Sequence, residues 1–128
     1  MAEIKFFTPT KLSGRYEQLK CDAHLLISIK GEKRKSTLHI FYIFNLMKKY
    51  NLKWEYARIG IWNENIYMEE GTELDGYQIH RMRNISNKTL VYNLFNGLKI
   101  DFPVSNNSLT KVRLGAKKFQ KGFLLTTI

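Results

Sequence analysis

The sequence predicts an α+β fold: a mainly antiparallel sheet, bent or arranged as an open barrel of hairpins, with one packed helix around residues 37–50. Apolar and polar residues alternate over several segments, turn residues separate these segments, and one stretch has the end signals of a helix. Only Pro9 and Pro103 interrupt the backbone, and no linker or repeat divides the chain. A chain of 128 residues has the usual size of one domain, so we expect a single domain over residues 1–128.

The clearest strand pattern runs from Leu19 to Lys30. One face of this strand is apolar, and the opposite face is polar except for Leu26. Cys21, the single cysteine, lies on the apolar face, so we expect a buried, inert thiol and no disulfide within the chain. The apolar face consists of Leu19, Cys21, Ala23, Leu25, Ile27 and Ile29.

Helical end signals favour a helix from Thr37 to about Tyr50. Ser36 can cap its N-terminus, and Lys48 and Lys49 stand in the last turn, where the helix dipole favours cations. Apolar residues surround most of this helix, so it would be buried nearly all round. In the alternative, residues 38–44 form a second strand paired with the first, because the stretch is rich in Ile and aromatic residues, and the fold becomes all-β.

The rest of the chain is predicted to form hairpins. The strongest signal is Asn96-Gly97, because an Asn-Gly pair between alternating segments favours a two-residue turn with positive φ at both residues. In that register Phe95 lies opposite Leu98. The predicted elements are a hairpin of 56–62 with 66–68, a strand over 77–83, a loop over 84–87, a hairpin of 90–95 with 98–102, and a final pair, 109–114 and 123–128, joined by a basic segment.

The net charge of +10 is distributed unevenly. Residues 1–53 contain 11 basic and 4 acidic residues, residues 54–75 contain 1 and 6, and residues 76–128 contain 9 and 1. Two basic flanks therefore enclose a short acidic block. A partner that carries negative charge would be attracted to the flanks.

The basic segments indicate a nucleic-acid-binding surface. Phosphates attract cations and unpaired bases stack on flat aromatic rings, so cations interleaved with aromatic residues are typical of proteins that bind RNA or single-stranded nucleic acid. Arg81 and Arg83 are expected to share a strand face with Tyr77. The candidate residues are Lys33, Arg34, Lys35, Tyr77, Arg81, Arg83, Lys111, Arg113, Lys117, Lys118, Phe119 and Lys121.

The acidic block is interpreted as a solvated loop or as a surface that docks on a protein partner. Its spacing matches no calcium-binding loop, so no metal is expected there. Its members are Glu64, Glu69, Glu70, Glu73 and Asp75.

Catalytic motifs are absent from the sequence. It contains no phosphate-binding Gly-rich loop, no Gly-x-Ser-x-Gly and no His-Glu-x-x-His. We therefore expect a non-enzymatic protein without a cofactor. One enzymatic alternative needs two of the histidines, His24, His39 and His80, to meet and act as the acid and base of a metal-independent ribonuclease.

Two other kinds of protein fit the same composition. One is a small inhibitor from a phage or mobile element that binds and blocks a host nucleic-acid-processing nuclease or ribonucleoprotein, in the manner of an anti-CRISPR protein. The other is a virion or assembly component. Residues 1–7 lack the apolar stretch of a signal peptide and no segment is long enough to cross a bilayer, so a cytoplasmic location without membrane contact is expected.

Overall fold

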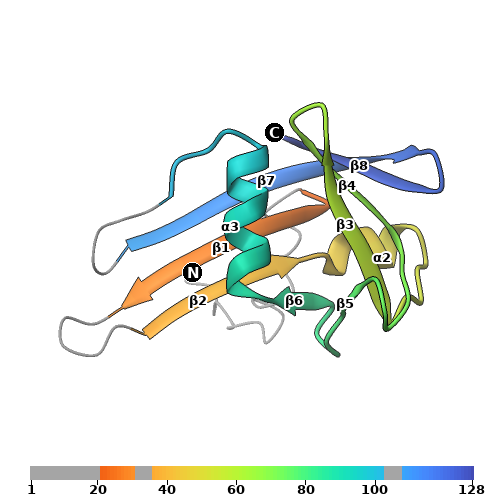
Figure 1. Ribbon diagram of the computed structural model, residues 1–128, viewed down its shortest axis with the longest axis horizontal. Coiled ribbons are helices and arrows are strands. Elements are labelled where there is room, and N and C mark those ends of the chain that lie inside the picture. Colours follow the sequence, from red (N-terminus) through yellow and green to blue (C-terminus); the bar gives the residue numbers. More distant parts are fainter. Residues whose placement is uncertain (1–20, 31–35, 103–107) are drawn as a thin grey trace, which may run out of the picture.

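The fold is known from a computed structural model, which describes residues 21–30, 36–102 and 108–128. It contains an eight-stranded antiparallel sheet with the strand order β5-β3-β4-β8-β7-β1-β2-β6 (Figure 1). The predicted class, mainly antiparallel β with one packed helix, is confirmed. The elements are β1 (Ala23–Lys30), β2 (Ser36–Tyr42), α2 (Phe44–Lys49), β3 (Tyr56–Trp62), β4 (Asn65–Glu70), β5 (Tyr77–Gln78), β6 (Asn84–Ser86), α3 (Lys88–Gly97), β7 (Ser108–Phe119) and β8 (Gly122–Thr127).

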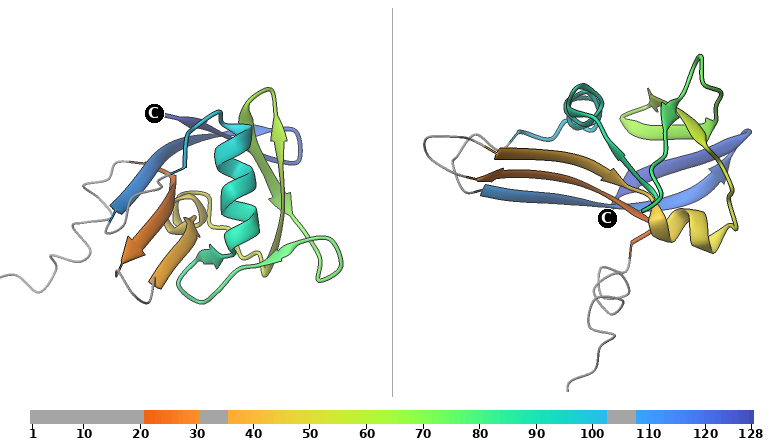
Figure 2. Two further views of the ribbon diagram at one scale, coloured as in Figure 1. Left: turned by 60° about the vertical axis from the view of Figure 1, so that its left-hand side comes forward. Right: turned by 90° about the horizontal axis from the view of Figure 1, so that it is seen from below.

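The sheet bends strongly, and α3 lies inside the bend. Helix α3 contacts β1 and β2 on one side and β3 and β4 on the other, and Figure 2 shows it between these two parts of the sheet. Val91, Leu94 and Phe95 are at most 2% exposed and pack against the inner face of the sheet. The core is therefore a layer of apolar side chains between the helix and the curved sheet.

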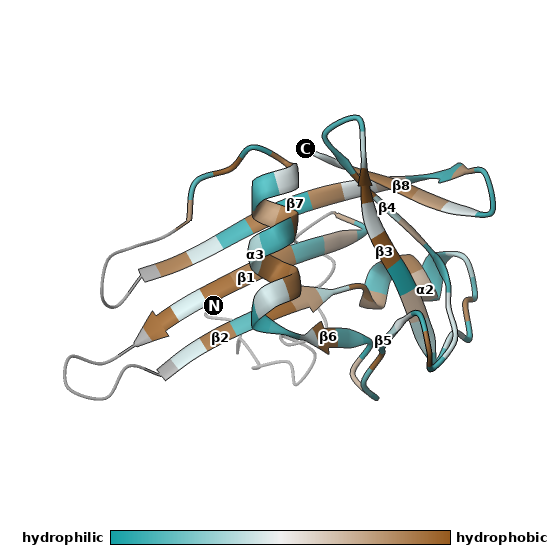
Figure 3. Cartoon of the chain, viewed as in Figure 1, coloured by the Kyte–Doolittle hydropathy of each residue, from teal (hydrophilic) through white to brown (hydrophobic). Residues whose placement is uncertain are grey.

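Strand β1 is a central strand, paired with β7 on one side and β2 on the other. Its predicted apolar face is confirmed, because Leu25 and Ile27 are completely buried and Cys21 is buried beside them. The opposite face, which was predicted to be polar, is also buried at His24, Leu26 and Ser28. A central strand has neighbours on both sides, so even its outward-facing side chains lose most of their solvent contact. Figure 3 shows how hydrophobic and hydrophilic residues alternate along the neighbouring strand β7.

The helix predicted over 37–50 is wrong over its first half. Residues Ser36–Tyr42 form β2, the alternative considered from the sequence, and the helix is the six-residue α2. His39 and Phe41 are buried while Leu38 is exposed, which is the alternation of a strand. Pairing with β1 along seven residue pairs outweighs the helical signal of Ser36.

The Asn96-Gly97 hairpin is also wrong, because this segment forms α3. Asn87 caps the helix: the Leu90 N–H donates to Asn87 Oδ1 at 2.8 Å. Leu90, Val91, Leu94 and Phe95 recur with helical spacing and are buried. The residue with positive φ at this helix end is Lys99, at 60°, rather than Asn96 or Gly97. Gly97 allows a close approach, since a Cβ there would meet the side chain of Ile61.

Three other boundaries differ from the prediction. The predicted strand over 77–83 is limited to β5, because the His80 N–H donates to Asn84 O and the Arg83 N–H to His80 O, and these bonds close a turn. The predicted loop over 84–87 contains β6. Strand β7 continues through the basic segment to Phe119, while the hairpin of β3 and β4 is confirmed.

Neither α2 nor α3 has the length and apolar character of a helix that crosses a bilayer.

A close contact of Gly122 predicts a large stability effect. A Cβ at Gly122 would collide with the main-chain oxygen of Met68 in the neighbouring strand. Backbone cannot move as easily as a side-chain end, so we expect Gly122→Ala to lower the free energy of unfolding by about 2 kcal/mol in urea denaturation. Gly60→Ala is the matched control, because nothing lies within 4 Å of a Cβ there. An equal loss in both variants would contradict this explanation.

The cap of α3 makes a second prediction. Asn87→Ala removes the acceptor of the Leu90 N–H, so the free energy of unfolding is expected to fall by about 1 kcal/mol. Asn93→Ala changes an exposed residue of the same helix and should leave stability unchanged or slightly raised, since Ala favours helix more than Asn. Thermal and urea unfolding of both variants measure the difference. A hairpin in place of α3 would reverse this order.

Candidate nucleic-acid interface

The structure places the predicted nucleic-acid-binding residues in different parts of the molecule. Lys33, Arg34 and Lys35 lie outside the described residues. Tyr77 lies in β5 and is partly buried against the core, while Arg81 is exposed in the turn that follows. The expected strand face shared by Tyr77, Arg81 and Arg83 is therefore wrong. The remaining residues form two groups, one on the outer face of β7 and one near α2.

The group near α2 lines two adjoining hollows. The first holds about 490 Å³ and has Lys48, Lys53 and Arg83 in its lining. The second holds about 390 Å³ and has Lys118 and Lys121 in its lining. Both are also lined by Leu52 and Trp54, so the hollows adjoin at these two side chains. We call this surface the α2 basin.

Hydrogen bonds between α2 and the residues just before β1 hold this helix in place at the basin. The Leu46 N–H donates to Asp22 O at 2.8 Å, and Asn45 Nδ2 donates to Cys21 O at 2.9 Å. The carboxylate of Asp22 also accepts from the Ala116 N–H at 2.8 Å and pairs with Lys49 Nζ at 3.4 Å. Asp22 therefore connects β1, β7 and α2, and it fixes the helix that carries Lys48.

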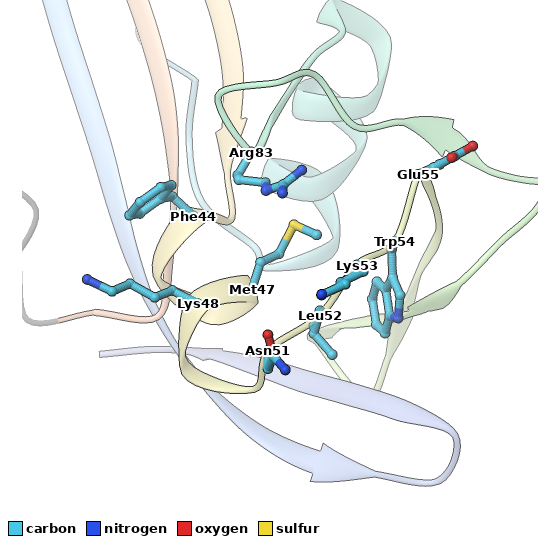
Figure 4. Close-up of a pocket in the computed structure, with 9 residues that line it drawn as sticks. All are labelled: Phe44, Met47, Lys48, Asn51, Leu52, Lys53, Trp54, Glu55 and Arg83. Carbon is cyan, nitrogen blue, oxygen red and sulfur yellow. The ribbon is translucent and has the colours of Figure 1, made fainter.

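Arg83 reaches the first hollow from a tight turn. Its φ is 56°, in the left-handed region that residues other than Gly, Asn and Asp rarely adopt. Its carbonyl accepts from the Ile43 N–H at 3.0 Å, just before α2. Figure 4 shows the guanidinium of Arg83 beside the side chain of Met47, and the side chain of Lys53 close to those of Leu52 and Trp54. The turn thus brings a cation from the segment before β6 to α2.

Aromatic rings form the wall between the hollows. The ring of Tyr50 lies 4.6 Å from that of Phe123, and the ring of Trp54 lies 5.9 Å from the same phenyl ring. Lys118 Nζ stands 5.9 Å from the centre of the Tyr50 ring. Tyr50 and Trp54 are half-buried, so each ring is held by the core and still has exposed surface.

The basin is strongly positive. Lys48, Lys53, Arg83, Lys118 and Lys121 form no ion pair within the part of the chain that the structure describes. The carboxylate in the lining of the first hollow is that of Glu55, which Figure 4 shows pointing away from the other lining side chains. An anion in the basin would meet cations whose charge is not already neutralised.

The second group lies along the outer face of β7. Lys111, Arg113, Lys117 and Phe119 alternate with inward-facing residues, so they share the face opposite α3. Lys118 is the exception among the predicted cations of this strand, because its position in the register faces Phe123 on the core side. The predicted nucleic-acid-binding residues that the structure describes therefore lie on two separate surfaces and do not form a single one.

The acidic block is dispersed and partly neutralised. Arg58 pairs with Glu69 at 3.2 Å and with Asp75 at 3.6 Å. Hydrogen bonds from the N–H and hydroxyl of Thr72 lower the pKa of Asp75. Glu64 lies in the turn between β3 and β4, and Glu70 and Glu73 are exposed. Among the described residues no three His, Cys, Asp or Glu side chains are grouped as metal ligands.

The three histidines do not come together. His24 pairs with Tyr42 on the outer face of the sheet, whereas His39 pairs with Ile27 and faces inward. His80 is exposed in the turn after β5. The arrangement that a two-histidine ribonuclease requires is therefore not formed by these side chains.

The sequence analysis missed Lys48, Tyr50, Lys53 and Trp54. These residues interleave cations with aromatic rings, which is the same signal that singled out residues 111–121. Lys48 was instead considered as part of a helix end and Trp54 as part of the acidic stretch 54–75, so their contribution to a binding surface was overlooked.

Comparisons with known proteins provide no further assignment. No protein-family model matches the chain, no curated protein matches it, and no solved structure matches it.

The burial of His24 predicts a pH-dependent stability. Burial, together with the charges of Lys111 and Arg113, lowers the pKa of His24 to about 4, and its ring stacks on Tyr42 at 4.5 Å. In the unfolded chain His24 has its ordinary pKa of 6.5, so above that pH the ring is neutral in both states and its contribution to stability is complete. As the pH decreases from 6.5 toward 4, the unfolded chain takes up a proton that the folded protein does not bind. The free energy of unfolding therefore falls by up to about 1.4 kcal/mol per pH unit from this group.

Urea denaturation between pH 7.5 and 4 tests this expectation. His24→Phe retains an aromatic ring against Tyr42 but cannot titrate, so its stability should fall less over this range. Burial also lowers the pKa of His39, so protonation of His39 accounts for part of the stability that His24→Phe still loses at low pH. Identical pH profiles for the two proteins would contradict the role of His24.

Proposed function

We propose that the protein is a non-enzymatic nucleic-acid-binding protein that contacts RNA or single-stranded nucleic acid through the α2 basin. The observation that supports this proposal is a set of five cations, none of which forms an ion pair with another described residue, around two adjoining hollows that share Trp54. The phosphate backbone supplies most of the affinity in such complexes, and cations are what it requires. A neutral or cationic ligand would gain nothing from this arrangement.

The aromatic wall favours unpaired bases over duplex DNA. Tyr50 and Trp54 each offer a partly exposed ring among the cations, and a splayed base can stack on such a ring. Duplex bases are already stacked, and sequence-specific duplex readers usually insert a helix or ribbon into the major groove. Here α2 has six residues, and α3 lies inside the bend of the sheet, in contact with strands on both sides. Single-stranded nucleic acid is therefore the better fit.

Binding without catalysis is the simpler function for this lining. General acid-base cleavage of a phosphodiester needs two titratable groups near the phosphate, and metal-dependent cleavage needs several carboxylates. The described lining of the two hollows contains one carboxylate, Glu55, and no histidine. The proposal therefore assigns the basin a binding role.

Fluorescence anisotropy with labelled single-stranded RNA, single-stranded DNA and duplexes at several salt concentrations tests the proposal. The double variant Lys53→Glu/Lys121→Glu changes one cation in each hollow. We expect it to bind single strands at least tenfold more weakly than the unchanged protein. If each lysine contacts one phosphate, the slope of log K against log salt should fall by about 0.7 per contact.

The matched control is Lys88→Glu/Lys99→Glu, which changes the net charge equally at exposed positions at the two ends of α3. It should retain most of the affinity and the salt slope. An equal loss in both double variants would indicate attraction by net charge without a site. No binding by the unchanged protein near physiological salt would contradict the proposal and redirect the search to a protein target, as expected for an inhibitor of a nuclease complex.

A further inference from the structure

A second aromatic group lies outside the basin, on the outer face of the sheet. The rings of Trp62 and Phe119 lie 4.7 Å apart, and the ring of Tyr67 lies 6.0 Å from Phe119. Trp62 is 46% exposed although it is one of the largest apolar side chains of the molecule. We call Trp62, Tyr67 and Phe119 the outer aromatic cluster. A ring that is supported on one side and exposed on the other is available for stacking.

The strand register places this cluster on one face with a cation. Tyr67 pairs with Leu124 of β8, and Leu124 pairs with Lys117 of β7. Because paired residues share a face, Tyr67, Lys117 and Phe119 all lie opposite α3. Gly60 pairs with Tyr67 and has nothing within 4 Å of a Cβ position, so the surface beside Trp62 is open.

The hairpin of β7 and β8 connects this cluster to the α2 basin. Alternation along β7 directs Lys118 into the second hollow, while its neighbours Lys117 and Phe119 face the outer side. Lys121, in the turn of the same hairpin, lines the hollow, and its main chain hydrogen-bonds with the hydroxyl group of Tyr67. The two surfaces are therefore the two sides of one hairpin tip.

We propose that a single strand bound in the α2 basin continues around the tip of the β7–β8 hairpin and stacks a base on Trp62 in the outer aromatic cluster. This inference rests on the proposed function. Lys118 and Lys121 hold phosphates before the turn, and Lys117 holds one after it. Such a path selects single strands, because a duplex, with a persistence length of about 150 base pairs, cannot bend around a hairpin tip.

Intrinsic fluorescence separates the two surfaces, since the protein has two tryptophans, one in each. In Trp54→Phe the remaining emission comes from Trp62, and in Trp62→Phe it comes from Trp54. Both variants retain an aromatic ring at the changed position, so both should remain folded. The probe is unlabelled oligouridine of 4 to 16 nucleotides, the range of site sizes found for single-strand-binding domains.

We expect the longest oligouridine to quench Trp62 in Trp54→Phe and Trp54 in Trp62→Phe. The shortest should quench one of the two tryptophans more than the other, because it cannot span the hairpin tip. A 16-nucleotide strand that quenches Trp54 but leaves Trp62 unchanged would overturn the inference while the proposed function stands. Absence of binding in the anisotropy assay would instead overturn both.

Affinity provides a second measurement. Trp62→Ala removes the stacking surface, so the affinity for a 16-nucleotide strand should decrease about tenfold, as for the loss of one stacked base. Leu74→Ala is the matched control, because Leu74 is an apolar side chain that is 98% exposed, lines neither hollow, and follows the end of the β3–β4 pair that is opposite Trp62. The melting temperature of Trp62→Ala shows that the variant is folded, and Trp62→Leu, which keeps an apolar side chain without a ring, replaces it if it is not. Unchanged affinity in the folded variant would overturn the inference.

Discussion

The position of α3 inside the bend of the sheet determines the rest of the structure. The helix covers the inner face of β1 and β2 and also contacts β3 and β4, so both parts of the sheet are held against one layer of apolar side chains. Sheets with one uncovered apolar face are unstable in water, and a curved sheet around a helix covers that face with few residues. The α2 basin is a consequence, because its lining comes from residues 44–55, 83 and 118–123, which only the bend brings together.

The sequence predicted the fold class better than the location of its helices. Alternation identified β1, the β3–β4 hairpin and the last two strands because these segments have a clear period of two residues. The same criterion failed at residues 88–97, where apolar residues occur in pairs, Leu90-Val91 and Leu94-Phe95, that fit both a strand and a helix. The side chain of Asn87 caps the helix, a local signal that was overlooked because residues 84–87 were assigned to a loop. The close approach of Gly97 to Ile61 also favours the helix, and it is a contact between distant parts of the chain that a local pattern does not contain.

The candidate site was predicted in part. Arg83, Lys118 and Lys121 were identified as cations and do line the basin, but their convergence depends on the turn at 80–84, on the length of β7 and on the position of α2. Lys111, Arg113 and Lys117 were grouped with Lys118 because they are close in sequence. Strand alternation directs Lys118 to the opposite face, so nearness in sequence grouped residues that lie on two different faces of the sheet. The aromatic partners Trp54 and Trp62 come from segments that the charge analysis assigned to the acidic block.

The ends of the described sheet have a further consequence for how this molecule meets others. Its outermost strands are β5, with two residues, and β6, with three. They cover only part of the strands beside them, because β6 pairs with residues 40–42 of β2 and β5 pairs with Tyr56 and Ala57 of β3. Within the described residues, the remainder of β2 and of β3 therefore has a main-chain edge without a paired strand. Edges of this kind can pair with an incoming strand, so association of this molecule through main-chain hydrogen bonds would begin at residues 36–39 or 58–62.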